Sequence, residues 1–142
     1  MQVQKKLSLE TWIFLAWFTA AVAMAGSLFF SEVMKFPPCV LCWYQRIGMY
    51  PLVLLLLPAV FTFEKQVFKY TLPLAISGWL VSVYHNLLYY KILPESASPC
   101  VQGISCTTEY IEWLGFITIP LLSLSAFTII ISTLIFCQRK DS

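Results

Sequence analysis

The chain has 142 residues, of which 59% are hydrophobic and only 11% are charged, and its formal net charge is +2. Soluble domains usually carry about 25% charged residues, so this composition predicts a membrane protein. The sequence has no basic patch with interleaved aromatic residues, which argues against nucleic acid as a partner. No linker rich in Gly or Ser divides the chain, so we expect a single domain, 1–142.

Four long apolar segments are each near the roughly 20 residues that a helix needs to cross about 30 Å of hydrocarbon. The runs are continuously apolar rather than alternating, which predicts helices and not the strands of a membrane barrel. The first segment follows Lys5-Lys6 and resembles a secretory signal, but its apolar run continues past the cleavage-like site, which favours a retained helix. We therefore expect an all-α membrane protein, a four-transmembrane-helix bundle with helices at about 11–31, 43–63, 70–90 and 113–136.

The distribution of basic residues predicts how the bundle is oriented, because cytoplasmic loops carry an excess of Lys and Arg. Six basic residues flank one set of helix ends and three flank the other, so we expect both termini in the cytoplasm. The two longer connections, about 32–42 and 91–112, then lie outside. The inner set is Lys5, Lys6, Lys65, Lys69, Arg139 and Lys140, and the outer set is Lys35, Arg46 and Lys91.

The five cysteines divide unevenly between the two sides. Cys39, Cys42, Cys100 and Cys106 fall in the outer connections, where disulfides persist, and Cys137 falls at the inner end of the last segment. Four cysteines allow three pairings, of which two local pairs are the simplest. The residues leave structural disulfides and a redox relay open as alternatives. We expect no metal, because C-x5-C is a poor match to zinc spacing, and no haem, because His does not follow the C-x-x-C.

Three features of the segment 39–46, CVLCWYQR, favour redox chemistry. A C-x-x-C disulfide closes too small a ring to stabilise much by chain entropy. Cys42 lies at the start of a predicted helix, whose positive dipole end favours a thiolate. Arg46 follows four residues later, about one turn along the same face, so its charge can support a thiolate or a bound anion. An arginine that merely extends to the membrane surface is the alternative.

His85 is the only histidine of the chain. It lies five residues from the outer end of its predicted helix, at a depth of about 7–8 Å, which is similar to the depth of Arg46. An ionisable residue inside a membrane indicates a functional site, although a hydrogen-bonded core histidine is an equal alternative. We therefore expect Arg46 and His85 to converge beneath Cys42, where a lipid-soluble electron acceptor would be found.

The motif PCVLCWYQR, followed by an apolar helix, resembles the signature of the DsbB family of disulfide-bond-formation proteins, which are quinone-dependent thiol oxidases. The short second connection, SPCVQGISC, resembles the compact BdbC-type branch from Gram-positive bacteria, and the similarity covers essentially the whole chain. The C-x-x-C-x-x-x-R element is specific when it opens the second of four membrane helices. An alternative within the enzymes is the reverse reaction, a thiol-driven reductase such as the vitamin K epoxide reductase group. That group places its C-x-x-C at the last helix of its core, so the position of the motif here argues against it.

The resemblance implies a multi-pass protein of the bacterial cytoplasmic (inner) membrane with its active cysteines outside. It also implies a path for electrons: a DsbA-like, thioredoxin-fold partner attacks Cys100, Cys106 then attacks Cys39, and Cys42 is released beside a quinone. Arg46 matches a motif position at the quinone site, and His85 is a looser equivalent. The choice between ubiquinone and menaquinone stays open, as does the order of attack. The alternative from another class is a small four-span structural protein held by two outer disulfides.

Overall fold

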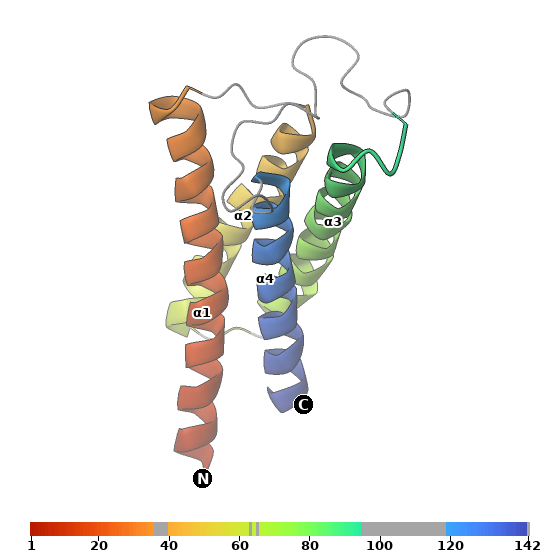
Figure 1. The fold of residues 1–142 in the computed structure, drawn as a ribbon. Coiled ribbons are helices and arrows are strands. Elements are labelled where there is room, and N and C mark those ends of the chain that lie inside the picture. The colour runs from red at the N-terminus through yellow and green to blue at the C-terminus, as the bar shows by residue number, and fades with distance from the viewer. Residues whose placement is uncertain (36–39, 63, 65, 95–118, 142) are drawn as a thin grey trace.

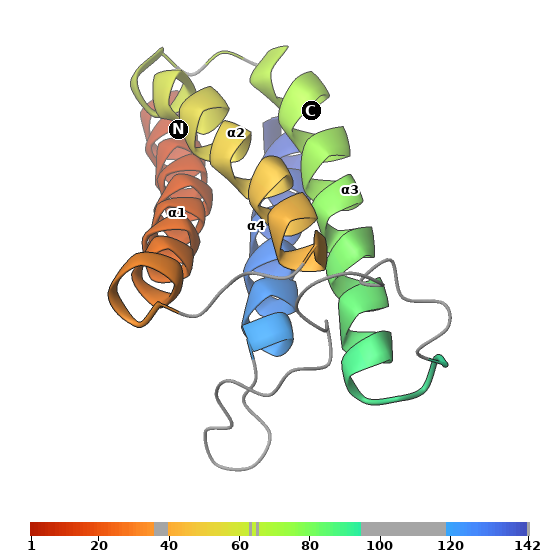
Figure 2. The ribbon, with the colours of Figure 1, turned by 90° about the horizontal axis from the view of Figure 1, so that it is seen from above.

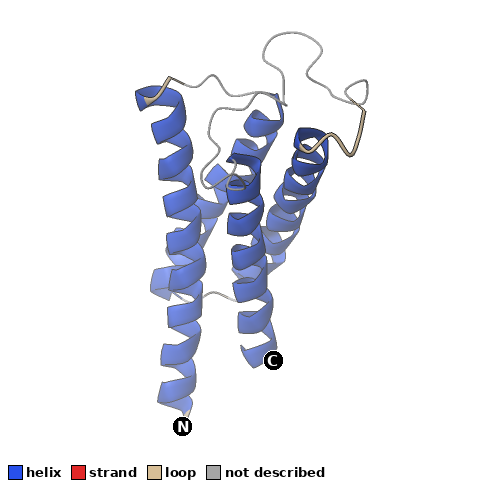
Figure 3. Cartoon of the chain, in the orientation of Figure 1, coloured by secondary structure: helices blue, strands red, loops and turns tan. Residues whose placement is uncertain are grey.

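The computed structural model describes residues 1–35, 40–62, 64, 66–94 and 119–141. Within these ranges every regular element is a helix (Figure 3), which confirms the all-α prediction for this part of the chain. Helix α1 spans Gln2–Leu28 and continues into a π-helical turn, η1, over Phe29–Val33. The other helices are α2 at Val40–Thr62, α3 at Gln66–Tyr89 and α4 at Ile119–Asp141.

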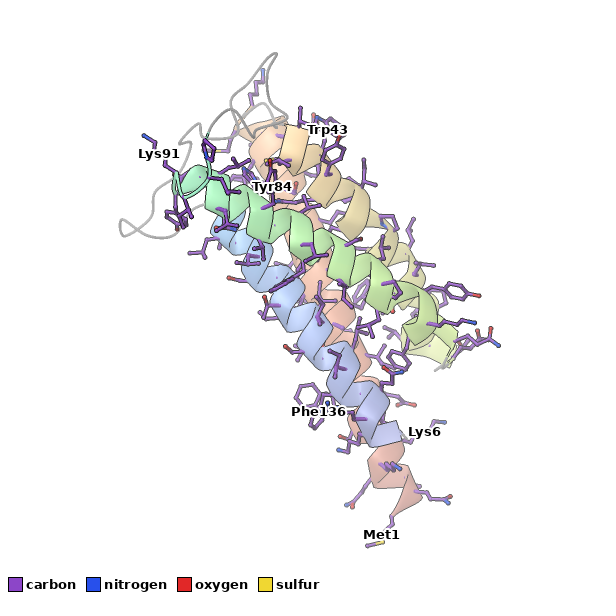
Figure 4. The ribbon with its side chains drawn as sticks, turned by 90° about the vertical axis from the view of Figure 1, so that its right-hand side faces the viewer. Met1, Lys6, Trp43, Tyr84, Lys91 and Phe136 are labelled. Carbon is purple, nitrogen blue, oxygen red and sulfur yellow. The ribbon has the colours of Figure 1, made fainter. Side chains whose placement is uncertain are left out.

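The four α-helices run alternately up and down in a bundle (Figure 1). The main contacts join α1 to α2, α2 to α3, α3 to α4, and α4 back to α1. Seen end-on, α1 and α3 lie on opposite sides with α2 and α4 between them (Figure 2). We call the end that holds both chain termini the terminal end, and the opposite end, where α2 begins and α3 finishes, the loop end. Met1 and Lys6 mark the terminal end, and Trp43 and Lys91 mark the loop end (Figure 4).

Three stretches described by the structure are long and apolar enough to cross a membrane: α1 with η1, α2, and Pro120–Lys140 of α4. Helix α3 is not among them because it carries several polar residues. Four of those residues face the interior of the bundle, whereas Ile76 and Leu80 are exposed on its outer surface. The buried polar side chains of α3 are Thr71, Ser82, His85 and Asn86, and its exposed polar residues include Lys69 and Ser77.

Helices α1, α2 and α3 begin earlier than the predicted apolar segments do. Helix α1 starts at Gln2 rather than near residue 11, because a helix continues into water once its backbone hydrogen bonds are formed. Lys6 and Glu10 face each other there across one turn, 4.0 Å apart. Helix α2 starts at Val40, so Cys42 lies inside its first turn.

Helix α3 ends in a Schellman motif. The Ile92 N–H donates to the carbonyl of Leu87 at 3.0 Å, and the Lys91 N–H donates to the carbonyl of Leu88 at 3.1 Å. Lys91 itself adopts a left-handed conformation with φ of 59°, a position that usually belongs to glycine. The motif turns the chain sharply at the loop end, directly before the connection to α4.

A buried amide joins α3 to α4 at the same end. The Asn86 Nδ2 donates to the carbonyl of Pro120 at 2.9 Å and to the carbonyl of Ser82 at 2.8 Å. Pro120 lies in the first turn of α4, where a residue without an N–H costs the helix nothing. The first turn of α4 is thus held against the last turns of α3.

The terminal half of the bundle has a closely packed apolar interior. Cys137 belongs to this interior, and its Sγ donates a hydrogen bond of 3.9 Å to the carbonyl oxygen of Leu9. All four α-helices contribute buried side chains there, and these include Leu9, Ile13, Ala59, Phe68 and Leu134.

Candidate functional site

A cavity of about 500 Å³ lies in the loop-end half of the bundle, between α1, η1, α2 and α4. Sites for small organic molecules typically enclose about 300–1,000 Å³ and combine apolar walls with a few polar groups. Phe18, Val22, Leu122 and Ile129 supply apolar wall from α1 and α4. The polar residues of the wall include Ser27 of α1 and Cys42, Gln45, Arg46 and Tyr50 of α2.

One stripe of α2 delivers most of these polar groups. Cys42, Arg46 and Tyr50 follow each other at four-residue intervals, and residues spaced in this way lie on one face of a helix. The helix starts at Val40, early enough to include Cys42 in the stripe. The structure therefore brings two of the predicted site residues, Cys42 and Arg46, to the wall of the same cavity.

The Arg46 side chain is fixed by α1. Its Nε donates to Ser27 Oγ at 2.8 Å, and its Nη2 donates to the Ser27 carbonyl at 2.9 Å. Its guanidinium also lies over the Trp43 ring, 5.4 Å from the ring centroid. The accepting carbonyl lies two residues before the π-helical turn η1, and π-helical turns are frequent at functional sites. Arg46 is therefore a positioned cation and not a side chain that only extends to the membrane surface.

His85 reaches the cavity only through another residue. It is 2% exposed, lies on α3 and is not among the residues that line the cavity. Its Nδ1 accepts a hydrogen bond of 3.1 Å from Nε2 of Gln45, which does line the cavity and is 6% exposed. The sequence predicts that Arg46 and His85 converge beneath Cys42, and the structure connects them only indirectly. Arg46 bonds to α1, whereas its neighbour Gln45 bonds to His85 on α3.

The structure describes only two of the five cysteines, Cys42 and Cys137. Cys39, Cys100 and Cys106 lie outside the described residues. Cys42 is half-buried in the cavity wall, and Cys137 is buried at the terminal end of α4. Cys42 and Cys137 therefore lie at opposite ends of the bundle.

Ser27, Gln45 and Tyr50 are site residues that the sequence analysis does not single out. All three are uncharged, so a search for ionisable residues passes over them. Gln45 does carry a signal, because an amide inside a membrane helix is expected to find a hydrogen-bond partner on another helix. Ser27 and Tyr50 carry no such signal, since serine bonds within its own helix and tyrosine is common near membrane surfaces.

Residues 9–137 match the family described as "Disulfide bond formation protein DsbB". The chain belongs to the DsbB family. It is 51% identical over 119 residues to "Disulfide bond formation protein C" of Bacillus subtilis, covering 84% of this chain and 86% of the relative. It is 47% identical over 130 residues to "Probable disulfide formation protein C 1" of Bacillus anthracis, covering 90% and 93%. No solved structure gives a significant match.

Membership in the DsbB family confirms the resemblance drawn from CVLCWYQR, and the relatives of the C type confirm the short-loop branch. Joining two thiols into a disulfide removes two electrons, so a disulfide-forming protein is an oxidoreductase. The chain is accordingly a disulfide-forming oxidoreductase of a membrane-protein family. This decides between the two classes that the cysteines alone left open, and the purely structural alternative is wrong.

Proposed function

We propose that the chain is a quinone-dependent thiol oxidase that reoxidises a DsbA-like, thioredoxin-fold carrier outside the bacterial cytoplasmic membrane. The single observation that carries the proposal is the cavity whose wall holds both Cys42 and Arg46. In the net reaction the carrier dithiol becomes a disulfide and the quinone becomes a quinol, so two electrons and two protons are transferred.

The arrangement of the bundle supports four spans with both termini in the cytoplasm. Both termini lie at one end, and the basic residues Lys5, Lys6, Arg139 and Lys140 belong to the helix turns nearest to them. Helix α3 is included as a span because four of its polar side chains, Thr71, Ser82, His85 and Asn86, are buried inside the bundle, and large apolar side chains such as Ile76 and Leu80 are exposed on its outer surface. The cavity then lies in the outer leaflet, on the side from which the carrier approaches.

The cysteines relay the electrons by successive thiolate–disulfide exchange. A carrier thiolate attacks Cys100 of the Cys100–Cys106 disulfide, and the Cys106 thiolate that leaves attacks Cys39 of the Cys39–Cys42 disulfide. Cys42 leaves as a thiolate. The second carrier thiolate releases the oxidised carrier from Cys100, and Cys100 then attacks Cys106, which frees Cys39. The Cys39–Cys42 pair is now reduced, and it closes again when it gives up two electrons.

The described residues of the cavity fit a quinone. Its wall is mostly apolar, as a ring with a hydrocarbon tail requires, and Arg46, whose guanidinium carries N–H donors, is one of the residues that line it. When bound, a quinone supplies an acceptor for two electrons and two protons. Ser27 holds the Arg46 charge on this wall, where it stabilises a thiolate on Cys42 and negative charge that develops on the acceptor.

His85 acts in this proposal as a positioning residue. The Gln45 amide nitrogen lies 3.1 Å from Nδ1 of His85, within hydrogen-bond distance. The bond fixes the Gln45 amide, which in turn lines the cavity. A His85 variant is expected to change the binding of the acceptor by releasing Gln45.

Turnover in lipid nanodiscs tests the proposal directly. The protein is supplied with a reduced DsbA-like protein and a 1,4-benzoquinone carrying a decyl tail, and quinol formation is followed by absorbance. We expect turnover by the wild type and by the control variant Cys137→Ala, whose cysteine lies at the terminal end, and none by Cys42→Ser. Turnover that survives Cys42→Ser, or a wild type that forms no quinol, would contradict the proposal.

The order of attack has its own test. The variant Cys106→Ser is supplied with the oxidised carrier, so that the free Cys100 thiolate attacks the carrier disulfide and retains the carrier as a mixed disulfide, with one carrier thiolate leaving. In Cys100→Ser the residue that meets the carrier is missing. We expect a covalent complex with the carrier on non-reducing gels for Cys106→Ser only. A complex that forms only with Cys100→Ser would reverse the order.

A further inference from the structure

The hydroxyl of Tyr50 is a buried polar group with no hydrogen-bond partner in the described part of the chain. Tyr50 lines the cavity, and its aromatic ring packs against the apolar interior. Burying a hydroxyl without a partner costs free energy that phenylalanine at the same position would avoid. A buried, unsatisfied group in a native structure therefore calls for a specific explanation.

The other hydroxyls on the cavity wall do not share this property. Ser27 accepts from Arg46, and Ser123 exchanges a hydrogen bond with Ser82 of α3. The rest donate to a carbonyl of their own helix: Thr19 to Leu15, Ser31 to Leu28 and Ser125 to Leu121. Tyr50 lines the same cavity but differs from these residues, because its buried hydroxyl has no hydrogen-bond partner among the described residues.

The spacing of Arg46 and Tyr50 along α2 is similar to the spacing of the two oxygen atoms of a 1,4-quinone. Arg46 precedes it by one turn, which is about 6 Å along the helix axis. The two oxygens of a 1,4-quinone lie on opposite corners of the ring, roughly 5 Å apart given C=O bonds of about 1.23 Å. Two acceptors at that separation suit two donors that are one turn apart on the same stripe of α2.

We propose that the Tyr50 hydroxyl donates a hydrogen bond to the quinone oxygen remote from Cys42, so that Arg46 and Tyr50 form a two-point site selective for 1,4-quinones. This inference rests on the proposed function, since it names the group that holds the inner end of the acceptor. Tyr50 would act in binding and selectivity. The thiol exchange reactions at the loop end would not depend on it.

The test compares Tyr50→Phe with Tyr44→Phe, a control on the same helix whose side chain is 51% exposed and is not on the cavity wall. Quinone affinity is measured from the rise in melting temperature with decyl-1,4-benzoquinone and from quenching of tryptophan fluorescence. We expect Tyr50→Phe to bind about three- to tenfold more weakly than the wild type, and Tyr44→Phe to bind like the wild type.

The melting temperature without quinone separates this role from a structural one. Removing an unsatisfied buried hydroxyl leaves the quinone-free protein equally stable or more stable. We therefore expect Tyr50→Phe to melt at or above the wild-type temperature without quinone and to gain less from its addition. A variant that loses equal stability with and without quinone would show that Tyr50 is structural, and would overturn the inference.

Changing the ligand tests the same inference in a second way. An analogue with the same ring and tail but a single carbonyl is expected to bind wild type and Tyr50→Phe equally, because Arg46 is the stronger donor for one oxygen. If Tyr50→Phe binds the full quinone as tightly as the wild type, a water molecule satisfies the hydroxyl and the inference fails while the proposed function stands. If neither the wild type nor Tyr44→Phe binds quinone, the proposed function fails and the inference fails with it.

Discussion

The two halves of the bundle are built on different principles. The terminal half is filled by apolar side chains from all four α-helices, and even its cysteine, Cys137, is part of that packing. The loop-end half contains a cavity, a fixed cation, a buried amide–imidazole pair and a hydroxyl that has no partner among the residues the structure describes. The terminal half supplies stability, and this allows the loop-end half to keep the open space and unsatisfied groups that a ligand site needs.

The largest effect on this contrast is expected from Leu134→Ala in the terminal half. Leu134 is 1% exposed, and a cavity left in close packing costs about 2–5 kcal/mol of unfolding free energy. Quinone reduction by the protein that remains folded should be unchanged. Thermal unfolding in nanodiscs measures the loss, with Ile135→Ala, at a partly exposed position, as the milder control. A large drop in turnover without a drop in stability would contradict the view that the terminal half supplies stability while the loop-end half holds the ligand site.

The next effect is expected from Arg46→Met, which keeps the length of the side chain and removes its charge. Losing a hydrogen bond to a charged group costs about 1.5–3 kcal/mol, so quinone reduction should slow roughly 10- to 100-fold. Thiol exchange with the carrier should continue. Because Arg46 also joins α2 to Ser27 of α1, a modest loss of stability is expected as well. Normal quinone kinetics in this variant would refute the role given to Arg46.

A double-variant cycle on Gln45 and His85 asks whether their bond serves stability alone. His85→Phe or Gln45→Leu alone breaks this buried hydrogen bond and should cost about 1–3 kcal/mol. The combined variant should recover most of that stability, since both groups become apolar. Under the proposed function its quinone affinity stays low. Full recovery of affinity together with stability would make the pair purely structural.

The smallest effect is expected at the end of α3. Lys91→Gly removes the side chain from a left-handed position and should stabilise the protein by about 0.5–1 kcal/mol, the balance between steric relief and backbone entropy. Turnover should not change, because Lys91 does not line the cavity. Thermal unfolding is the measurement, and a loss of stability would show that the lysine side chain has a contact of its own.

The sequence predicts the helices well because hydropathy acts locally. Uncharged runs of about 20 residues identify each segment, and the helix ends differ mainly where the chain leaves the apolar region, as at Gln2. The stripe of Cys42 and Arg46 is also predictable, since both residues lie on one helix and follow its period.

The partners of these residues on other helices are not predictable in the same way. The bond from Arg46 to Ser27 joins residues of different helices, and it depends on how each helix is rotated within the bundle. Rotation is set by the packing of many side chains, which no single spacing encodes. For the same reason the sequence places Arg46 and His85 at a similar depth but does not reveal that they face different neighbours of α2.

The bond from Asn86 to Pro120 has a kinetic consequence. It fixes the point where α4 begins against α3, so the connection that carries Cys100 and Cys106 is a tether whose two ends are held at the loop end. Under the proposed relay, exchange between the two cysteine pairs is intramolecular, and its rate depends on the effective concentration that this tether imposes. Doubling the length of a flexible tether costs only about 0.6 kcal/mol, roughly a threefold slower encounter. Lengthening this connection in the present chain should therefore slow the proposed relay only slightly.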